Sequence, residues 1–271
     1  MKRQIVRLGS FLFPGLMARI AYQQLTSPQV KKLRPHELEK LNEAQKTALP
    51  FQGFTIQTYQ WGNPEHERIL LIHGWEGQAG NFADLIDPLL AQKYFVIAFD
   101  GPSHGFSSKG PTSLFEFSDL VGQMVRQYQC RKLVSHSFGG VATTYGLYKN
   151  QDLPIDKYAL LTTPDMFSQR IDDVARFVGI SEGVKQRLIT RLEAEMQVDV
   201  QSIGVSRFVE DLSVKKALII HDKNDRVIPL AQSQNVCAHW PVCELKVVEG
   251  TGHFRILRTP SVLQQVVDFM D

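Results

Sequence analysis

Short continuous apolar runs recur along most of the chain, and each is followed by a loop, several of which contain glycine, and by a segment with helical periodicity. Such runs are typical of strands that are buried on both faces of a parallel sheet. Their alternation with helices predicts an α/β fold. The predicted buried strands cover residues 69–72, 94–99, 133–134, 158–161, 217–220 and 245–248, and the predicted helices between and after them cover 83–92, 118–129, 139–149 and 261–269.

Residues 51–61 show a different pattern, because apolar and polar positions alternate there. Alternation predicts a strand, and the following Gly62-Asn63-Pro64 predicts a turn. We therefore expect the core domain to consist of residues 51–164 and 215–271.

The rhythm of strands and helices is interrupted between Pro164 and Val214, where no β-like run occurs. Residues 169–178, 181–196 and 205–212 have helical patterns. A helical stretch of this length between two buried strands predicts a cap over one edge of the sheet, comprising residues 165–214.

The chain before the core is basic and amphipathic. Apolar residues recur at helical spacing from Ile5 to Ile20, and residues 35–47 predict a further short helix. Pro14 and Arg19 interrupt the apolar stretch, which disfavours a signal peptide or a membrane-spanning helix. Contact of residues 1–34 with a membrane surface is possible, but we favour a helical extension, residues 1–50, that packs on the main domain with its basic face in water.

Composition narrows the functional classes. The 271 residues include 43% hydrophobic and 21% charged residues, which is enough apolar material for one large core and argues against a disordered chain. Lys and Arg number 30 against 28 Asp and Glu, for a net charge of +2. Because nucleic-acid binding depends on a basic surface, we expect no nucleic-acid partner. The oligomeric state cannot be inferred.

The three cysteines, Cys130, Cys237 and Cys243, form no C-x-x-C motif. A sparse, odd number of cysteines fits a reducing compartment better than a disulfide framework. We therefore expect a cytoplasmic location.

A candidate nucleophile lies directly after the predicted strand at 133–134. The segment from Ser135 to Gly139 matches the G-x-S-x-G nucleophile elbow, except that Ser135 replaces the first glycine. The elbow is a sharp turn that requires small residues on both sides of the serine and exposes its hydroxyl before a helix N-terminus. The alternative is an ordinary turn in which Ser137 caps the helix.

Two later loops offer the partners that a serine nucleophile needs. A serine hydroxyl requires a nearby base, and a histidine requires a carboxylate to hold its tautomer. His253 follows the last predicted strand, and Asp225 follows the preceding one. The order Ser137, Asp225, His253 is that of the α/β-hydrolases. Asp222 is the rival acid, but it lies at the strand end and more plausibly caps the loop.

At these motifs the chain resembles the α/β-hydrolase superfamily from about Phe51 to the C-terminus. His73-Gly74-Trp75 is similar to the family's H-G-x oxyanion segment, and residues 100–107 are similar to its D-x-P-G-H-G-x-S loop, with Ser103 in place of a glycine. The resemblance implies a mostly parallel central sheet flanked by helices, with a small helical cap. It also implies Ser137 as nucleophile, and backbone N–H groups of Trp75 and Phe138 as the oxyanion hole.

The resemblance also suggests how neighbouring residues act. Trp75, Met166, Phe167, Phe177 and Phe208 could line the substrate pocket, with ordinary packing as the alternative for each of the cap residues. We expect His136 to pack away from the catalytic face, and Asp100 and His104 to hold their loop. The chain has no P-loop, G-x-G-x-x-G or H-E-x-x-H motif, and its eight histidines are scattered, so we expect no cofactor and no metal.

The predicted activity is hydrolysis of small-molecule carboxylic esters through an acyl-enzyme. A thioesterase, a C–C bond hydrolase and a cofactor-free perhydrolase could use the same three residues. A non-catalytic binding protein on the same scaffold is a further alternative. A haloalkane dehalogenase or an epoxide hydrolase is disfavoured, because those relatives need an aspartate at the position of Ser137.

Overall fold

A computed structural model describes residues 11–30, 32–196 and 198–271. The fold is that of the α/β-hydrolases, built on one eight-stranded sheet with the strand order β1-β2-β4-β3-β5-β6-β7-β8. Strand β2 runs antiparallel to both of its neighbours, and the other pairs are parallel. The strands are β1 (Gln45–Phe51), β2 (Phe54–Trp61), β3 (Glu67–Ile72), β4 (Tyr94–Phe99), β5 (Lys132–His136), β6 (Ile155–Leu161), β7 (Val214–Asp222) and β8 (Cys243–Val248).

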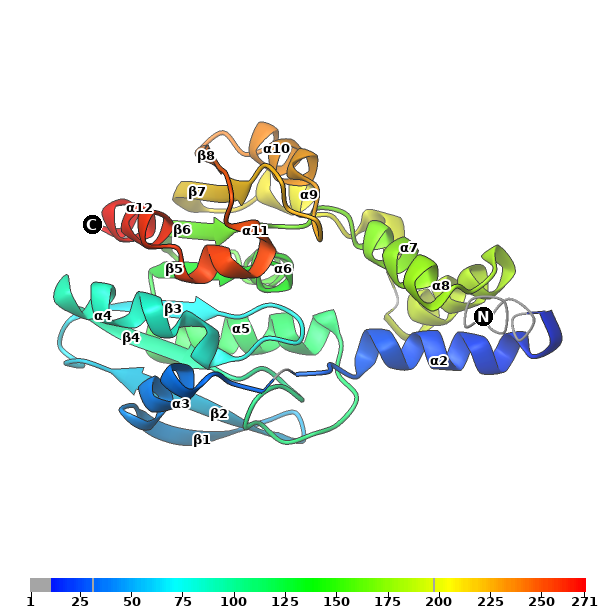
Figure 1. The fold of residues 1–271 in the computed structure, drawn as a ribbon, viewed down its shortest axis with the longest axis horizontal. Coiled ribbons are helices and arrows are strands. Elements are labelled where there is room, and N and C mark those ends of the chain that lie inside the picture. Colours follow the sequence, from blue (N-terminus) through cyan, green and yellow to red (C-terminus); the bar gives the residue numbers. More distant parts are fainter. Residues whose placement is uncertain (1–10, 31, 197) are drawn as a thin grey trace.

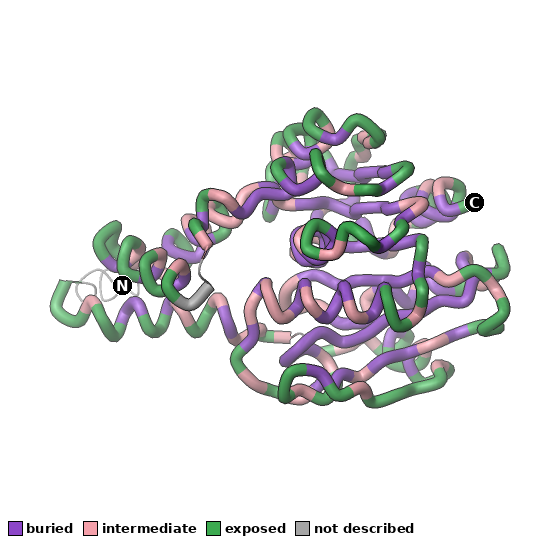
Figure 2. The backbone as a smooth tube through the Cα atoms, turned by 180° about the vertical axis from the view of Figure 1, so that it is seen from behind, coloured by how far each residue is buried: buried purple, intermediate pink, exposed green. Residues whose placement is uncertain are grey.

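Helices cover both faces of this sheet, which explains why successive apolar side chains of a central strand are buried on opposite faces. In β3, Leu70 and Ile72 face one hydrophobic cluster, whereas Ile69 and Leu71 face the other. Figure 2 shows the resulting concentration of buried residues in the sheet. One face is covered by α5 (Leu114–Tyr128), α6 (Phe138–Lys149), α9 (Val205–Val209) and α10 (Leu230–Ala238), and the other by α3 (Pro35–Asn42), α4 (Ala83–Ala91) and α12 (Pro260–Met270).

The beginning of the core differs from the sequence prediction. The predicted helix over 35–47 ends at Asn42, and residues 45–51 form β1, so the N-terminal extension is not helical throughout. The strand predicted at 51–61 is the second arm of a hairpin whose turn residues, Gln52 and Gly53, both have positive φ. Strand β1 lies at the sheet edge and is largely exposed, so it lacks the apolar pattern by which a buried strand is predicted.

The N-terminal helix α2 (Pro14–Thr26) packs on two helices of the predicted cap, α7 (Phe167–Val178) and α8 (Glu182–Met196). Ala21 of α2 is buried in one cluster with Ile171 and Leu188. The three helices extend away from the sheet together (Figure 1). The expected packing of this helix on the main domain is therefore wrong. Its outer face is also not mainly basic, because five large apolar side chains are exposed on or just before it: Phe11, Leu12, Phe13, Leu16 and Ile20.

The last helix in the 165–214 segment has a different environment. Val205, Phe208 and Val209 of α9 are buried in the main hydrophobic cluster, beside α6 and α10. Only α7 and α8, with the short 3-10 turn at Val200–Ser202, join α2 outside the core. None of the helices in the described ranges is long and apolar enough to cross a bilayer.

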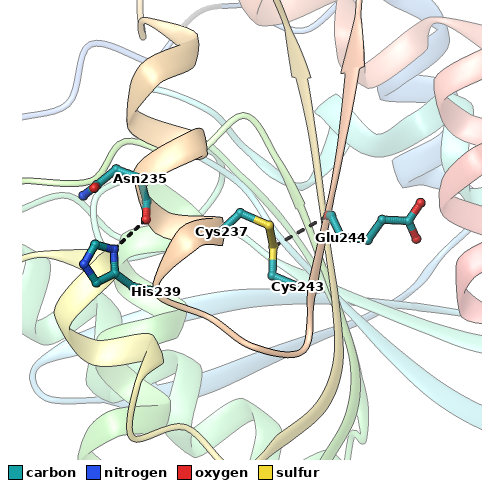
Figure 3. Close-up of a disulfide and its surroundings, with 5 residues drawn as sticks. All are labelled: Asn235, Cys237, His239, Cys243 and Glu244. Carbon is teal, nitrogen blue, oxygen red and sulfur yellow. Dashed lines mark hydrogen bonds between the residues drawn. A yellow bond between two sulfur atoms is a disulfide. The ribbon is translucent and has the colours of Figure 1, made fainter.

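A disulfide joins Cys237, in α10, to Cys243, at the start of β8, with 5.4 Å between the Cα atoms (Figure 3). Cys130 is free and buried. The sequence favoured a reducing compartment over a disulfide framework, and the structure contradicts this for two of the three cysteines. The pairing depends on a turn that brings the end of α10 back to β8, which the spacing alone does not reveal. Because disulfides persist mainly in oxidising compartments, it removes the basis for expecting a cytoplasmic location.

Candidate active site

Ser137 lies on a sharp turn between β5 and α6 and has the backbone angles φ 54° and ψ −124°. A positive φ is strained for a residue with a side chain and persists only where its surroundings enforce it. Here the Ser137 N–H donates to the carbonyls of Leu161 and Thr162, at 3.1 and 2.8 Å, and the Ser137 carbonyl accepts from the N–H of Gly140 at 2.8 Å. These bonds hold the turn between two neighbouring strands.

The small residues around the turn have distinct roles. A Cβ atom at Gly139 would lie 2.5 Å from the carbonyl oxygen of His73, so only glycine fits at this position. Ser135 replaces the usual first glycine without conflict, because its buried hydroxyl lies 2.8 Å from the hydroxyl of Tyr158. The departure from the G-x-S-x-G pattern therefore leaves the turn intact.

The structure brings together the predicted base and acid. His253, in α11 (Gly252–Arg255), donates from Nδ1 to Oδ2 of Asp225 at 2.8 Å. The other carboxylate oxygen accepts the N–H groups of Val227 and Ile228, at 2.7 and 3.0 Å. Burial alone would raise the pKa of Asp225, but the bond and charge of His253 and these two N–H groups hold that pKa below its ordinary value. Asp225 thus remains a carboxylate that can orient His253.

Ser137 and His253 line the same two cavities. Among the residues that the structure describes, however, no hydrogen bond joins their side chains. Catalytic hydrogen bonds often tighten only when substrate is bound. The hydrogen bond through which Ser137 would pass its proton to His253 is therefore expected to form only with bound substrate.

The rival acid Asp222 holds the loop that carries the histidine. Its carboxylate accepts from the N–H and hydroxyl of Thr251, from the N–H of Gly252 at 2.8 Å, and from the N–H of Asn224 at 2.7 Å. Although burial raises the pKa of Asp222, these bonds lower it overall. Asp222 acts on the backbone that positions His253, in agreement with its interpretation as a loop cap.

His136 has a position that the sequence did not indicate. Its Nε2 donates to the carbonyl oxygen of His253 at 2.9 Å, and its ring lies on the wall of one of the two cavities. Burial lowers the pKa of His136 to about 3, so the ring is neutral near pH 7. His136 therefore supports the His253 backbone as well as packing, and only its place beside Ser137 could have hinted at this.

Two backbone N–H groups are available beside the elbow. The His73 ring donates from Nδ1 to the carbonyl of Gly74 at 2.8 Å and accepts the N–H of Gly101 at 2.9 Å, which fixes the segment before Trp75. Within the described part of the chain, neither the N–H of Trp75 nor that of Phe138 donates to a protein acceptor. The rings of these two residues lie 5.1 Å apart. The two N–H groups could bind an oxyanion.

Asp100 and His104 hold the adjoining loop, as expected. Asp100 is fully buried and accepts the N–H groups of Ala79 and Phe106, both at 2.8 Å. His104 donates to the carbonyl of Pro102 at 2.8 Å. The polar side-chain atoms of Asp100 and His104 therefore bind backbone groups that hold the loop in place.

Two cavities meet at Ser137 and His253. The cap-side cavity, of about 240 Å³, lies against the start of α7, and Trp75, Met166 and Phe167 line it. The sequence suggested these three residues for the pocket. It also suggested Phe177, which is exposed, and Phe208, which is buried in the main hydrophobic cluster, and neither of them lines either cavity. The walls also include Val141 of α6 and the acidic and basic side chains Asp165, Asp173 and Arg170.

The arm-side cavity, of about 310 Å³, is lined by residues of the segment between α2 and α3, whose described part we call the arm (residues 27–30 and 32–34). Lys32 and Arg34 of the arm line it, together with Arg258 near the C-terminal helix. Sequence reasoning missed these residues. The base-rich, acid-free character of residues 1–34 was the signal that could have indicated them. No group of three or more His, Cys, Asp or Glu side chains gathers as a metal site within the described ranges.

Comparison with known proteins agrees with this architecture. Residues 69–264 match the alpha/beta hydrolase family. A probable serine hydrolase of Drosophila melanogaster is 36% identical over 96 residues, which are 33% of this chain and 29% of that protein. A serine hydrolase-like protein of Danio rerio is 27% identical over 65% of this chain and 58% of that protein. The matches thus span less than two thirds of either relative.

A solved structure shares the fold at low sequence similarity. The structure of Est1E from Butyrivibrio proteoclasticus with bound ferulic acid superimposes with a TM-score of 0.66. The alignment covers 83% of this chain and 97% of that one, at 18% identity. Both chains therefore have the same arrangement of strands and helices.

Proposed function

Because this chain belongs to the alpha/beta hydrolase family and is similar to proteins named as serine hydrolases, we propose that it cleaves carboxylic esters through an acyl-enzyme. The observation that carries the proposal is the Asp225–His253 pair, which faces the cavities shared with Ser137 on its strained turn. Strain at a nucleophile position is characteristic of sites where the backbone is held for function.

In the proposed reaction, the Ser137 hydroxyl oxygen attacks the ester carbonyl carbon while Nε2 of His253 takes its proton. The negative charge that forms on the carbonyl oxygen is stabilised by the N–H groups of Trp75 and Phe138. The C–O bond to the alcohol then breaks, and His253 gives its proton to the leaving alkoxide. A water molecule, deprotonated by His253, releases the acid and restores Ser137. Asp225 holds the ring throughout.

The test is a series of p-nitrophenyl esters of increasing acyl length, with thioesters of the same acyl groups beside it. We expect turnover of the esters with a short-chain optimum, because the cap-side cavity is small. Ser137→Ala is expected to lower kcat by at least about 10⁴-fold. A strong preference for thioesters would overturn the ester assignment.

Fluorophosphonate labelling separates an enzyme from a binding protein. We expect an adduct on Ser137 in mass spectrometry, since only an activated serine reacts with this reagent. Full esterase turnover by Ser137→Ala, in a preparation free of other esterases, would refute the mechanism. The absence of both adduct and turnover in folded protein would favour a non-catalytic binding protein.

A further inference from the structure

The arm-side cavity is unusual in the charges that face it. Three cations line it, Lys32, Arg34 and Arg258, against two carboxylates, Glu37 and Glu76. The cap-side cavity has the opposite balance, with Asp165, Asp173 and Glu76 against Arg170. Positive charge is therefore in excess only on the arm side of Ser137 and His253, the two residues of the elbow and the base that both cavities share.

The carboxylate of Glu37 is already occupied by protein donors. Glu37 is buried and accepts the N–H of Arg34 at 2.7 Å, the Arg34 guanidinium at 2.5 Å and the side-chain amide of Asn81 at 3.2 Å. It neutralises Arg34 and has little capacity left for other cations. Glu37 therefore does not compensate Lys32 or Arg258.

Donors in this cavity remain without partners. The Nε–H of Arg34 is buried and has no hydrogen-bond acceptor. In the part of the chain that the structure describes, Lys32 and Arg258 make no ion pair or side-chain hydrogen bond. A buried N–H without a partner is costly, and an anionic oxygen is its strongest acceptor. Cations in a concave site also concentrate anions there.

We propose that the arm-side cavity binds a carboxylate or phosphate group of the substrate, while the cap-side cavity holds its apolar end. This inference rests on the proposed ester hydrolysis and specifies its substrate class as esters with an anionic group on one side of the scissile bond. Lys32 and Arg258 supply positive charge that no group in the described part of the chain pairs, and Arg34, whose charge Glu37 neutralises, forms part of the same wall. The N-terminal arm thus contributes to substrate selection.

Matched ester pairs test the proposal. On the acyl side, mono-p-nitrophenyl glutarate is compared with p-nitrophenyl pentanoate, and on the alcohol side, 4-acetoxybenzoate with 4-methylphenyl acetate. For one of the two pairs we expect kcat/KM to favour the anionic ester. Lys32→Gln and Arg258→Gln should each lower that preference about five- to tenfold, mainly through KM, and high salt should weaken it.

Lys216→Gln is the control, because Lys216 is an exposed lysine on β7 outside both cavities. It should leave the preference unchanged. Equal kcat/KM within both pairs, or an anion preference that survives in Lys32→Gln/Arg258→Gln, would overturn the proposal. In that case, turnover of the neutral esters that is lost in Ser137→Ala would leave the proposed function standing.

A readout without turnover separates the two claims further. Calorimetry with glutarate, methyl phosphate and pentanol should show binding of one or both anions and no binding of the alcohol. The anion that binds more tightly identifies a carboxylate or a phosphate. Anion binding that depends on Lys32, in a protein that hydrolyses no ester, would refute ester hydrolysis but keep the anion site. Absence of anion binding would refute the site.

A second, independent observation concerns the outer face of the N-terminal helix. The α2 ridge consists of Phe11, Leu12, Phe13, Leu16 and Ile20, and the first four are 84%, 54%, 61% and 56% exposed. Contiguous exposed apolar side chains of this size mark an interaction surface. Their inner neighbours on α2 are already buried against α7 and α8.

The charge of this part of the chain indicates what covers the ridge. Residues 1–34 contain seven Lys or Arg residues and no Asp or Glu. Two copies of residues 1–34 could form no ion pair with each other, because this segment has no acidic residue. An apolar face within a base-only segment instead fits the surface of an anionic bilayer. We infer that the α2 ridge docks on anionic membranes.

Vesicle sedimentation tests this inference. The chain should bind vesicles that contain phosphatidylglycerol more tightly than vesicles of phosphatidylcholine alone, and Phe13→Ser/Leu16→Ser should weaken binding about tenfold or more. Phe177→Ser, at an 82% exposed position on α7, is the control and should bind like the wild type. Failure to bind anionic vesicles would overturn the inference, as would a dimer, measured by light scattering, that the ridge variant disrupts.

Discussion

The cap-side and arm-side cavities share Ser137 and His253 but differ in the origin of their walls. The cap-side wall includes the start of α7, with Met166 and Phe167, and is partly apolar. The arm-side wall includes Lys32 and Arg34 from a segment far earlier in the chain. Each wall thus includes residues of a segment added to the core beside residues of the core itself, whereas Ser137 and His253 follow core strands. The core therefore supplies the candidate reacting groups of the proposed hydrolysis, and under that proposal the added segments decide which substrates reach them.

We expect the largest effect on kcat from a substitution that acts equally on substrates of either cavity. Asp225→Asn should lower kcat about 10⁴-fold for neutral and anionic esters alike, because an amide no longer holds His253 in the required tautomer. Asp222→Asn is the matched change at the neighbouring carboxylate, which contacts the loop rather than the ring. It should lower the melting temperature and reduce kcat less. A larger kcat loss in Asp222→Asn than in Asp225→Asn would reassign the acid.

An intermediate effect should be confined to the cap-side cavity. Replacing Met166 or Phe167 with alanine enlarges the cap-side cavity beside Ser137. We expect the preferred acyl chain to lengthen, with a change of about tenfold in the ratio of kcat/KM for long and short esters. Phe177→Ala is the control, because Phe177 is exposed on the same helix but lines neither cavity. An identical shift in the control would show that α7 acts through its overall position.

The smallest effect concerns the arm-side cavity and pH. His136 lines only this cavity, and burial lowers its pKa to about 3. The unfolded chain binds a proton at this residue near pH 6.5, while the folded chain does not. Its contribution to stability is therefore present above about pH 6.5 and is lost progressively as the pH falls toward 3, at up to about 1.4 kcal/mol per pH unit.

Denaturant unfolding between pH 7 and pH 4 measures this pH-dependent contribution to the free energy of unfolding. His136→Gln should have a smaller pH dependence of the free energy of unfolding than the wild type, although it is less stable at pH 7. Burial also lowers the pKa of His73, His104 and His221, so some dependence should remain. An unchanged slope in the variant would contradict the role of His136.

The sequence by itself determined the sheet core and the candidate reacting residues. Buried parallel strands must be apolar on both faces, so β3 and β4 are recognisable from a short window of sequence. Ser137 and Asp225 follow the buried strands β5 and β7, and His253 follows the edge strand β8, all at the side of the sheet where the carboxyl ends of parallel strands meet. Their order along the chain predicted a triad, of which the structure shows the Asp225–His253 hydrogen bond and a cavity lining shared by Ser137 and His253.

Only the tertiary structure decided what surrounds that centre. The edge strand β1 has an exposed pattern, and its pairing with β2 depends on the hairpin turn rather than on apolar periodicity. The pairing of α2 with α7 and α8, the Cys237–Cys243 disulfide and the approach of Lys32 to Ser137 all join distant segments or depend on a turn. Such contacts follow from how folded surfaces fit together, and local sequence patterns carry no information about that fit.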